Sequence, residues 1–193
     1  MSGLYSVIYF LVSVSFAFVL FILWSRILVR LNRISVLTPV SQMIYHFTNP
    51  LVKPFSNLIN PQKVKSIHYD WACLATIIVV EFIKFILISL LLYGALMPMG
   101  YLLLFVFADL IMQPCNLLFY LILARVIMSW VNPSWQDITP LGNIVKKITE
   151  PLLDFGRYLT PNISGFDFSP LVILVILKAI TIFMSASLPA RLL

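Results

Sequence analysis

The sequence predicts an all-α membrane protein in which four transmembrane helices form two parallel two-helix repeats. Two observations lead to this fold class. The chain of 193 residues is 61% hydrophobic and only 10% charged, with a mean hydropathy of +1.02, whereas soluble domains average roughly 25% charged residues. In addition, residues 39–61 and 140–161 repeat one pattern about one hundred positions apart, and each copy lies between two long apolar segments.

The repeated pattern is centred on a Thr-x-Pro-Leu motif. Its two copies stand at a constant offset of 101, apart from the last proline, which aligns after one residue is dropped from the second copy. Internal repetition of this kind indicates a duplicated membrane module. We therefore expect a first repeat over residues 1–96 and a second over residues 97–193. The motif residues are Thr48, Pro50, Leu51 and Pro61 in the first copy and Thr149, Pro151, Leu152 and Pro161 in the second.

Four apolar segments are long enough to cross a hydrocarbon core of roughly 30 Å, which needs about 20 helical residues. They are residues 4–24, 71–92, 101–131 and 168–188. The first has no basic residue before it and no cleavage site after it, so we expect a mature span and not a signal peptide. The third is long and contains Pro114. We expect one kinked helix there, with a re-entrant piece or two short spans as alternatives.

Basic residues gather beside the spans and in the two long loops. Lys and Arg favour the cytoplasmic side of a membrane protein, and the connection around residues 93–101 has neither. Both long loops are therefore expected in the cytoplasm, with both termini outside. The excess of +6 points to anionic lipid headgroups and not to nucleic acid. The basic residues of the inner interface are Arg26, Arg30, Arg33, Arg125, Lys146, Lys147 and Arg157.

Each long loop carries apolar residues at helical spacing, which predicts short amphipathic helices over 38–61 and 139–161. Thr38-Pro39 and Thr139-Pro140 are favourable helix starts. Because the residue before a proline avoids the α region, Pro50 and Pro151 are expected to end the first helix of each loop. A second short helix would follow, closed by Pro61 or Pro161. These helices would lie in the membrane interface, facing either lipid or a docking partner.

Four ionisable residues fall inside or near the spans, where charge is costly and usually faces a partner or a cavity. Asp70 and Asp167 precede the second span of each repeat, and one charged residue follows eleven positions after each. These two, Glu81 and Lys178, are therefore expected to pair near the midplane. Lys84 and Asp109 could form a second pair in the outer half of the membrane. Such pairs either fix the helix register or line a polar path for an ion or small solute.

Residues suited to catalysis or metal binding are scarce. His46 and His68 are the two histidines, Cys73 and Cys115 are isolated, and neither type reaches metal-ligand spacing. No phosphate-binding glycine loop or nucleophile motif is present. We therefore expect no catalytic residue, no metal site and no cofactor.

Several stretches resemble the YggT family, called YlmG in some bacteria and in plastids. They are TPVSQMIYHFTNPLVKPFSNLINP with the following IKFIL, ARVIMSWVNP through TEPLL, and GFDFSPLV. The second repeat is the more similar to the family pattern. In the first repeat, Ser56-Asn57 stands where paired arginines often occur, and His68-Tyr69-Asp70-Trp71 replaces a Gly-Ile-Asp type of sequence.

The resemblance implies a small multi-pass protein of the bacterial inner membrane without enzymatic chemistry. Family members are associated with osmotic stress, assembly of membrane proteins or cofactors, and division or nucleoid organisation. The leading expectation is a membrane interaction or assembly protein, acting as a homo-oligomer or with a membrane-protein partner. The alternative is a small transport or osmotic-response protein that uses the Glu81 and Lys178 region. An enzyme is a distant third.

Overall fold

The computed structural model describes residues 2–59, 70–132, 134–159 and 167–188, and each regular element in these ranges is a helix. Four of the described helices are long and apolar enough to cross a membrane, over Gly3–Leu31, Trp71–Leu92, Met99–Val131 and Ser169–Ala186. The predicted all-helical fold with four spans is therefore confirmed. The elements are α1 (Ser2–Leu31), α2 (Pro39–Ile59), α3 (Trp71–Tyr93), α4 (Met99–Val131), α5 (Trp135–Ile138), α6 (Pro140–Leu159) and α7 (Ser169–Ala186).

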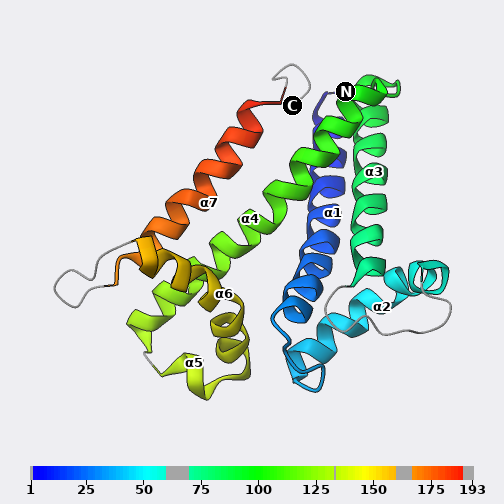
Figure 1. Cartoon of the computed structure of the whole chain (residues 1–193). Coiled ribbons are helices and arrows are strands. Elements are labelled where there is room, and N and C mark those ends of the chain that lie inside the picture. Colours follow the sequence, from blue (N-terminus) through cyan, green and yellow to red (C-terminus); the bar gives the residue numbers. More distant parts are fainter. Residues whose placement is uncertain (1, 60–69, 133, 160–166, 189–193) are drawn as a thin grey trace.

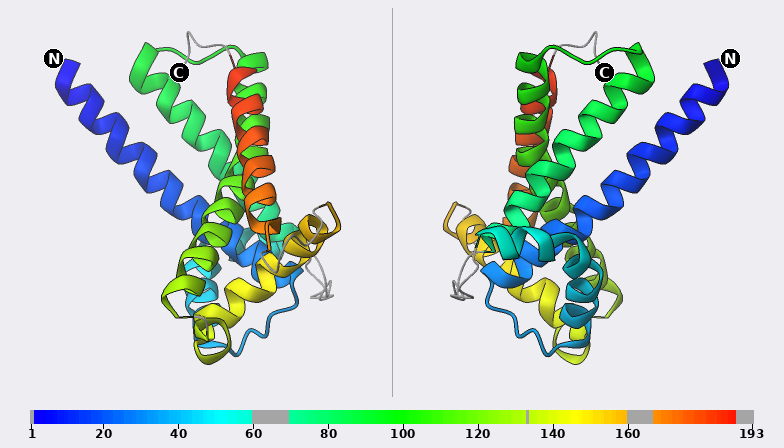
Figure 2. Two further views of the ribbon diagram at one scale, coloured as in Figure 1. Left: turned by 90° about the vertical axis from the view of Figure 1, so that its left-hand side faces the viewer. Right: turned by 90° about the vertical axis from the view of Figure 1, so that its right-hand side faces the viewer.

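The long helices run between two distinct ends of the molecule (Figure 1). The shorter helices α2, α5 and α6 lie together at one end, which we call the loop end. The start of α1, the end of α7 and the connection from α3 to α4 lie at the opposite end, which we call the terminus end. Helix α4 is central, because it contacts α1, α3, α6 and α7. Figure 2 shows α1 leaning away from α7 toward the terminus end, so the long helices open as a V.

The buried side chains of α1 gather toward the loop end. Leu20 and Leu23 of α1 pack against Val52 of α2 and Ile77 of α3. A second cluster joins the end of α1 to α4 and α6, and a third joins α4 to α6 and α7. The first half of α1 is largely exposed, and only 11% of the residues in the most apolar stretch of this helix are buried. That surface is left to lipid or to another protein.

Two helices differ in length from the expectation. Helix α1 continues to Leu31, beyond the predicted end at residue 24, because Arg26 and Arg30 bond to the carboxylate of Asp70. Helix α4 is continuous through Pro114, so the single helix expected over residues 101–131 is present and extends two residues earlier.

The prediction that Pro50 and Pro151 end their helices is wrong. Both prolines lie inside a continuous helix, α2 or α6. On α2 the buried face passes from Ser41 to Thr48 and Val52 in helical phase, whereas Pro50 is on the exposed side. A proline removes one backbone hydrogen bond, and the continuous packing of the buried face keeps the helix intact around that gap. Pro61 and Pro161, predicted to close each loop, lie outside the described residues.

The connection from α3 to α4 is a tight turn at the terminus end. Gly94 has a φ of +65° and donates its N–H to the carbonyl of Leu90, a left-handed helix end for which glycine carries no Cβ penalty. The buried hydroxyl of Ser89 donates to Ala95 O at 2.7 Å and accepts from Met97 N at 2.8 Å. These bonds hold the ends of α3 and α4 together.

Candidate functional site

The first candidate site is a buried arginine at the end of α1. Arg26 Nη1 donates to Thr48 Oγ1 at 2.9 Å and to Asn49 Oδ1 at 3.0 Å, and Arg26 Nε donates to Asp70 Oδ2 at 2.9 Å. One face of its guanidinium lies over the ring of Tyr45, 4.5 Å from the ring centre. This side chain therefore ties α1 to α2 and to the start of α3.

An equivalent arginine occurs in the second repeat. Arg125 on α4 donates through Nη1 to Thr149 Oγ1 and through Nη2 to Glu150 Oε2, both at 2.7 Å. The two threonines are the Thr48 and Thr149 of the repeat motif, and both are buried. The motif threonine is thus the acceptor for a cation that is removed from water. Its other bond goes back to its own helix, from Thr149 Oγ1 to Val145 O at 2.7 Å.

The aspartates before the second spans complete both clusters. Asp70 Oδ1 accepts from Cys73 N at 3.2 Å and so caps α3, while its Oδ2 accepts from Arg26. Asp167 Oδ1 accepts from Ser169 N at 2.9 Å, and its Oδ2 accepts from Arg157 Nε at 3.3 Å. A carboxylate at a helix N-terminus also interacts favourably with the helix dipole. Each cluster therefore joins two spans and the helix between them.

Sequence reasoning placed Arg26 and Arg125 at the interface but did not pair them with the motif threonines. The reason is a difference in loop length. Arg26 precedes Thr48 by 22 residues, whereas Arg125 precedes Thr149 by 24, so a fixed offset of 101 does not align the arginines. The signal that could have matched them is the similarity of Ser-Arg-Ile-Leu to Ala-Arg-Val-Ile at the end of each first span.

The other predicted basic residues lie at the same end of the molecule. Arg30 donates to Asp70 Oδ2 at 3.0 Å, and Arg33 follows α1 with a φ of +51°. Lys146 pairs with Asp137 at 2.8 Å on the exposed surface, and Lys147 is exposed on α6. All four are therefore at the loop end, outside the apolar parts of the spans.

Arg157 is the centre of an acidic group in the second repeat. It bonds to Glu150 at 2.9 Å, to Asp154 at 2.6 Å and to Asp167 at 3.3 Å. Burial opposes ionisation of Glu150, but hydrogen bonds from Arg157 and Arg125 outweigh it and lower the pKa of that carboxyl. For Asp167, burial is likewise outweighed by bonds from Ser169 and Arg157, so its pKa is also lowered. The bond with Glu150 is the main cause that raises the pKa of Arg157.

A second cluster lies within the spans, between α3 and α4. Lys84 Nζ contacts Glu81 Oε2 at 2.7 Å and also forms an ion pair with Asp109. Gln113 donates to Glu81 and, at 3.3 Å, to Asp109. The side chain of Glu81 is fully buried and that of Lys84 is 10% exposed. The structure thus brings Lys84 and Asp109 together, and one lysine is shared by two carboxylates.

Glu81 and Lys178 do not meet, contrary to the pairing expected from the repeats. Glu81 on α3 faces α4, and in the described residues α3 and α7 make no contact with each other. Lys178 is exposed on α7, with its amine 5.7 Å from the ring centre of Phe119. The two residues hold equivalent positions along their helices but lie on different sides of α4.

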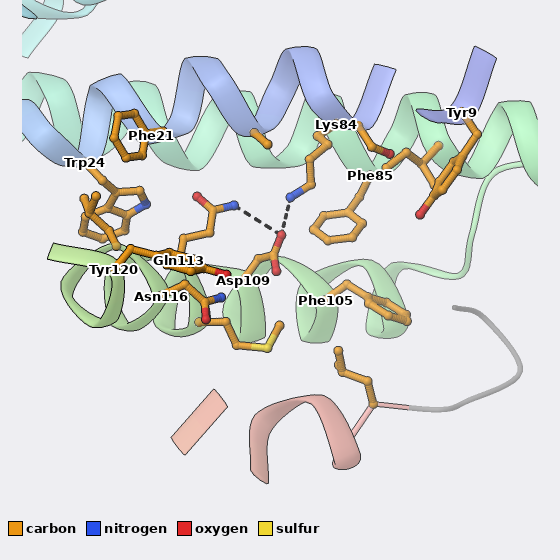
Figure 3. A pocket seen from close by; sticks show the side chains of 16 residues that line it. Tyr9, Phe21, Trp24, Lys84, Phe85, Phe105, Asp109, Gln113, Asn116 and Tyr120 are labelled. Carbon is orange, nitrogen blue, oxygen red and sulfur yellow. Dashed lines mark hydrogen bonds and ion pairs between the residues drawn. The ribbon is translucent and has the colours of Figure 1, made fainter. Parts of the chain in front are cut away.

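A cavity of about 400 Å³ opens between α1, α3 and α4 beside the Lys84 cluster (Figure 3). Lys84, Asp109 and Gln113 form part of its wall, and Trp24, Phe21 and Phe105 line other parts. Three polar atoms at this wall have no hydrogen-bond partner in the described part of the chain: Ser13 Oγ, Trp24 Nε1 and Gln113 Oε1. Toward the loop end, Leu28, Val29 and Leu117 line a second, apolar cavity of about 220 Å³.

The described residues contain no group of three or more His, Cys, Asp or Glu side chains that could hold a metal ion. Cys73 is buried, Cys115 is partly buried, and His46 lies edge-on to Phe47 in α2. His68 lies outside the described residues. The charged groups of the two repeat clusters and of the Lys84 cluster are held by the ion pairs and hydrogen bonds given above.

A chain of apolar helices with charged clusters at one end and within the spans is a multi-pass membrane protein. The pattern that defines the CCB3/YggT family matches residues 5–91 and 104–188, so the chain belongs to the CCB3/YggT family. The two matched segments agree with the internal duplication.

Three bacterial relatives illustrate this membership. The chain is 29% identical over 167 residues to a Vibrio alginolyticus protein named "Uncharacterized protein in proC 3'region", covering 86% of each chain. It is 28% identical over 143 residues to Escherichia coli K12 "Uncharacterized protein YggT", covering 74% of this chain and 70% of that one. An uncharacterized Pseudomonas aeruginosa protein is 29% identical over 172 residues, covering 89% and 84%. No solved structure matches the chain.

Proposed function

We propose that this protein is a non-enzymatic interaction or assembly protein of the bacterial inner membrane, which binds the transmembrane helix of another protein. The observation that carries the proposal is Lys178. It stands nine residues into α7, roughly 14 Å from the start of a span at 1.5 Å per residue. Its residue is exposed, and the contact found for its amine is the ring of Phe119.

An ammonium group near the middle of a bilayer is costly, and such groups normally face a partner or a water-filled cavity. A lysine side chain can reach several ångströms toward the interface, but this one starts close to the midplane. The exposed face of α7 around it is apolar, with Leu171, Val175 and Ile182. A neighbouring helix that carries a carboxylate at the same depth would neutralise the charge and cover this face.

The chemistry of the chain favours a different protein over a second copy as that neighbour. The described acidic residues within the spans are Glu81 and Asp109, and Lys84 engages both. A second copy would have to break that cluster to offer a carboxylate to Lys178. The partner we propose therefore has its own intramembrane Asp or Glu.

We place the loop end in the cytoplasm and the terminus end outside. Seven basic residues named above lie at the loop end, whereas the connection from α3 to α4 has none. Lys and Arg near the ends of spans set the orientation of membrane proteins in this sense. The cytoplasmic position of α2 and α6 follows from the same rule.

The cavity between α1, α3 and α4 favours a second candidate function, passage of an ion or small solute. Its wall carries Asp109 and Gln113 and three polar atoms without partners. Passage would need a polar path to both sides of the membrane, and toward the loop end the next cavity, of about 220 Å³, has an apolar wall apart from Ser25. Lys178 is not on this path. This geometry supports transport less well than partner binding.

The decisive experiment is extraction of the full chain from native membranes into nanodiscs, followed by particle mass and protein identification. We expect one stoichiometric partner that has an acidic residue within a span. Replacing Lys178→Met keeps the length of the side chain and removes its charge, so it should release this partner. Lys178→Arg should retain it. Phe183→Ala, a change at an exposed position on another side of the same helix, is the control and should also retain it.

Two results would contradict the proposal. One is a particle that contains only this chain in the wild type. The other is a partner that stays equally bound in Lys178→Met. If the purified chain alone also moved solute into liposomes, and Gln113→Leu at the cavity wall abolished the flux, the transport candidate would replace it.

A further inference from the structure

The first repeat contains a small basic cavity whose wall includes no carboxylate, whereas the corresponding cavity of the second repeat, of about 470 Å³, has Asp167 beside Arg125 and Arg157 in its wall. The cavity of the first repeat measures about 320 Å³ and lies beside α2 at the loop end. Its wall consists of Arg26, Asn49, Val52, Lys53 and Ser56. Four of these five side chains carry polar groups, and two carry a positive charge.

The donors around this cavity are not all used by the protein. Arg26 donates through Nε to Asp70 and through Nη1 to Thr48 and Asn49. Among the described residues, its Nη2 has no acceptor. Asn49 accepts from Arg26 through Oδ1, which turns its amide NH₂ away from the arginine. Within the described chain Lys53 Nζ has no carboxylate partner. These three groups therefore present unused N–H donors to one space.

Positive charge exceeds negative charge at this cavity. Arg26 and Arg30 both bond to the same oxygen of Asp70. Lys53 adds a third cation. Asp70 bonds to both arginines but not to Lys53, so the wall of the cavity itself carries two cations, Arg26 and Lys53, and no carboxylate.

The second repeat provides an internal comparison, because the offset of 101 aligns the two α2 and α6 sequences. Glu150 stands where Asn49 is, Asp154 where Lys53 is, and Arg157 where Ser56 is. Glu150 occupies Nη2 of Arg125 at 2.7 Å. Asp154 and Asp167 neutralise Arg157. The cations of the second cluster are thus paired with the protein's own carboxylates.

We propose that the cavity of the first repeat binds a phosphate group, which takes the place that Glu150 fills in the second repeat. A phosphate oxygen is a strong acceptor for arginine and lysine. The site lies where α1 leaves its apolar segment, at the depth of lipid headgroups, so the source is an anionic phospholipid or a free phosphate. This inference does not depend on the partner proposed for Lys178.

The test uses the purified full chain in detergent and counts bound lipid by native mass spectrometry. Phosphatidylglycerol is the probe, and zwitterionic phosphatidylcholine is the reference. The substitution Asn49→Glu places a carboxylate beside Arg26 Nη2, as in the second repeat, and should lower phosphatidylglycerol affinity at least about tenfold without loss of melting temperature. Lys53→Gln should lower it roughly fivefold.

Asn143→Glu is the charge-matched control. Asn143 is exposed on α6 at the same end of the molecule, so the variant has the same net charge as Asn49→Glu but leaves the cavity unchanged. It should retain phosphatidylglycerol. Equal retention by Asn49→Glu and the control, or no preference over phosphatidylcholine in the wild type together with no binding of inorganic phosphate, would overturn the proposal.

Inorganic phosphate distinguishes the two sources. If millimolar phosphate displaces the lipid from the wild type and binds alone in a manner that Asn49→Glu abolishes, the site recognises the phosphate group itself. If phosphate neither binds nor competes while lipid binding still depends on Asn49 and Lys53, the headgroup of a membrane lipid is the ligand.

Discussion

At the scale of single residues, two buried arginines account for the Thr-x-Pro motif. Arg26 and Arg125 each leave an apolar helix and reach the hydroxyl of Thr48 or Thr149. A buried charge is tolerated only where hydrogen bonds and counter-charges surround it, and both arginines have these. The motif threonine therefore has a structural role: its hydroxyl accepts a hydrogen bond from a buried arginine. A helix that faced only lipid would have no such donor to satisfy.

Replacing Thr149→Val should destabilise the protein by about 1–3 kcal/mol, because Arg125 Nη1 is left without its buried acceptor. Thr48→Val should have an effect of similar size. The measurement is unfolding of the purified chain in detergent. Thr181→Val is the control, because among the described residues Thr181 bonds only to the carbonyl of Lys178 on its own helix. Equal effects for Thr149→Val and Thr181→Val would contradict the role assigned to the motif.

The acidic group around Arg157 should make stability depend on pH. The pKa values of Glu150 and Asp167 are lowered in the folded state, so their contribution is present above the ordinary carboxyl pKa of about 4. It is lost as pH falls through the folded values. Melting temperature should therefore fall below about pH 4.5, and the fall should be shallower in Glu150→Gln. A slope unchanged by Glu150→Gln would refute this assignment.

The direction in which some span residues point could not be predicted, because a helix that is apolar on all sides does not show which side faces the protein. Helix α7 is apolar on all sides, so the sequence places Lys178 at a depth but does not say which direction it faces. The repeat suggested that Glu81 would meet it, yet Glu81 has Lys84 three residues away on its own helix. Because Lys84 on the same helix neutralises Glu81, Glu81 does not need Lys178 as a counter-charge. Arg26 and Arg125 were found at the interface, but the unequal loops hid their correspondence.

At the scale of helices, the continuous buried face of α2 and α6, and not the position of their prolines, determined where these helices end. The bounds of α3, α4 and α7 lie within two residues of the predicted spans, because long apolar segments with polar ends are a strong signal. In α6 the buried positions Val145, Thr149, Leu153 and Gly156 follow helical spacing across Pro151. The prediction that Pro151 ends the helix considered the proline alone and did not take this periodicity into account.

Gly142 tests how closely α5 and α6 fit together. A Cβ at this position would meet the carbonyl oxygen of Trp135 and would lie 2.7 Å from Thr139 Oγ1 and 2.8 Å from Gln136 Cα. Gly142→Ala should therefore destabilise the loop end by about 1–3 kcal/mol. Gly100→Ala is the control, with nothing within 4 Å of the added Cβ, and should be neutral or slightly stabilising. Unfolding curves of both variants measure the difference.

The Lys84 cluster should behave as a unit that joins α3 to α4. Lys84→Met leaves two carboxylates without a cation inside the bundle and should cost about 3–5 kcal/mol. Adding Glu81→Gln and Asp109→Asn to Lys84→Met removes both orphaned charges and should recover most of the lost stability. If the triple variant were less stable than Lys84→Met alone, the three charges would not be acting on one another.

At the scale of the whole molecule, the two repeats share an arrangement but differ in surface charge. Both place their middle helix at the loop end and bind it with an arginine. The first cluster is left with excess positive charge, and the cations of the second are paired with carboxylates. Duplication thus supplied two copies of one scaffold whose polar chemistry then diverged.

The proposed orientation can be measured with single cysteines and a membrane-impermeant maleimide. Leu37, between α1 and α2, and Tyr158, at the end of α6, are strongly exposed at the loop end, and Leu96 is exposed at the terminus end. In intact cells, Leu96→Cys should react after passage of reagent through the outer membrane, and Leu37→Cys and Tyr158→Cys should not. In inverted inner-membrane vesicles the pattern should reverse. Reaction of Leu96→Cys only in inverted vesicles would mean the opposite orientation.

Helix α4 is longer than a membrane is thick. From Met99 to Arg125 it rises about 39 Å at ~1.5 Å per residue, against a hydrocarbon thickness of roughly 30 Å. A helix with such hydrophobic mismatch tilts, and its tilt increases when the bilayer thins. Because α4 touches α1 and α3 on one side and α7 on the other, its tilt changes the spacing of the two repeats. We therefore expect a change in bilayer thickness to alter the separation of the two repeats.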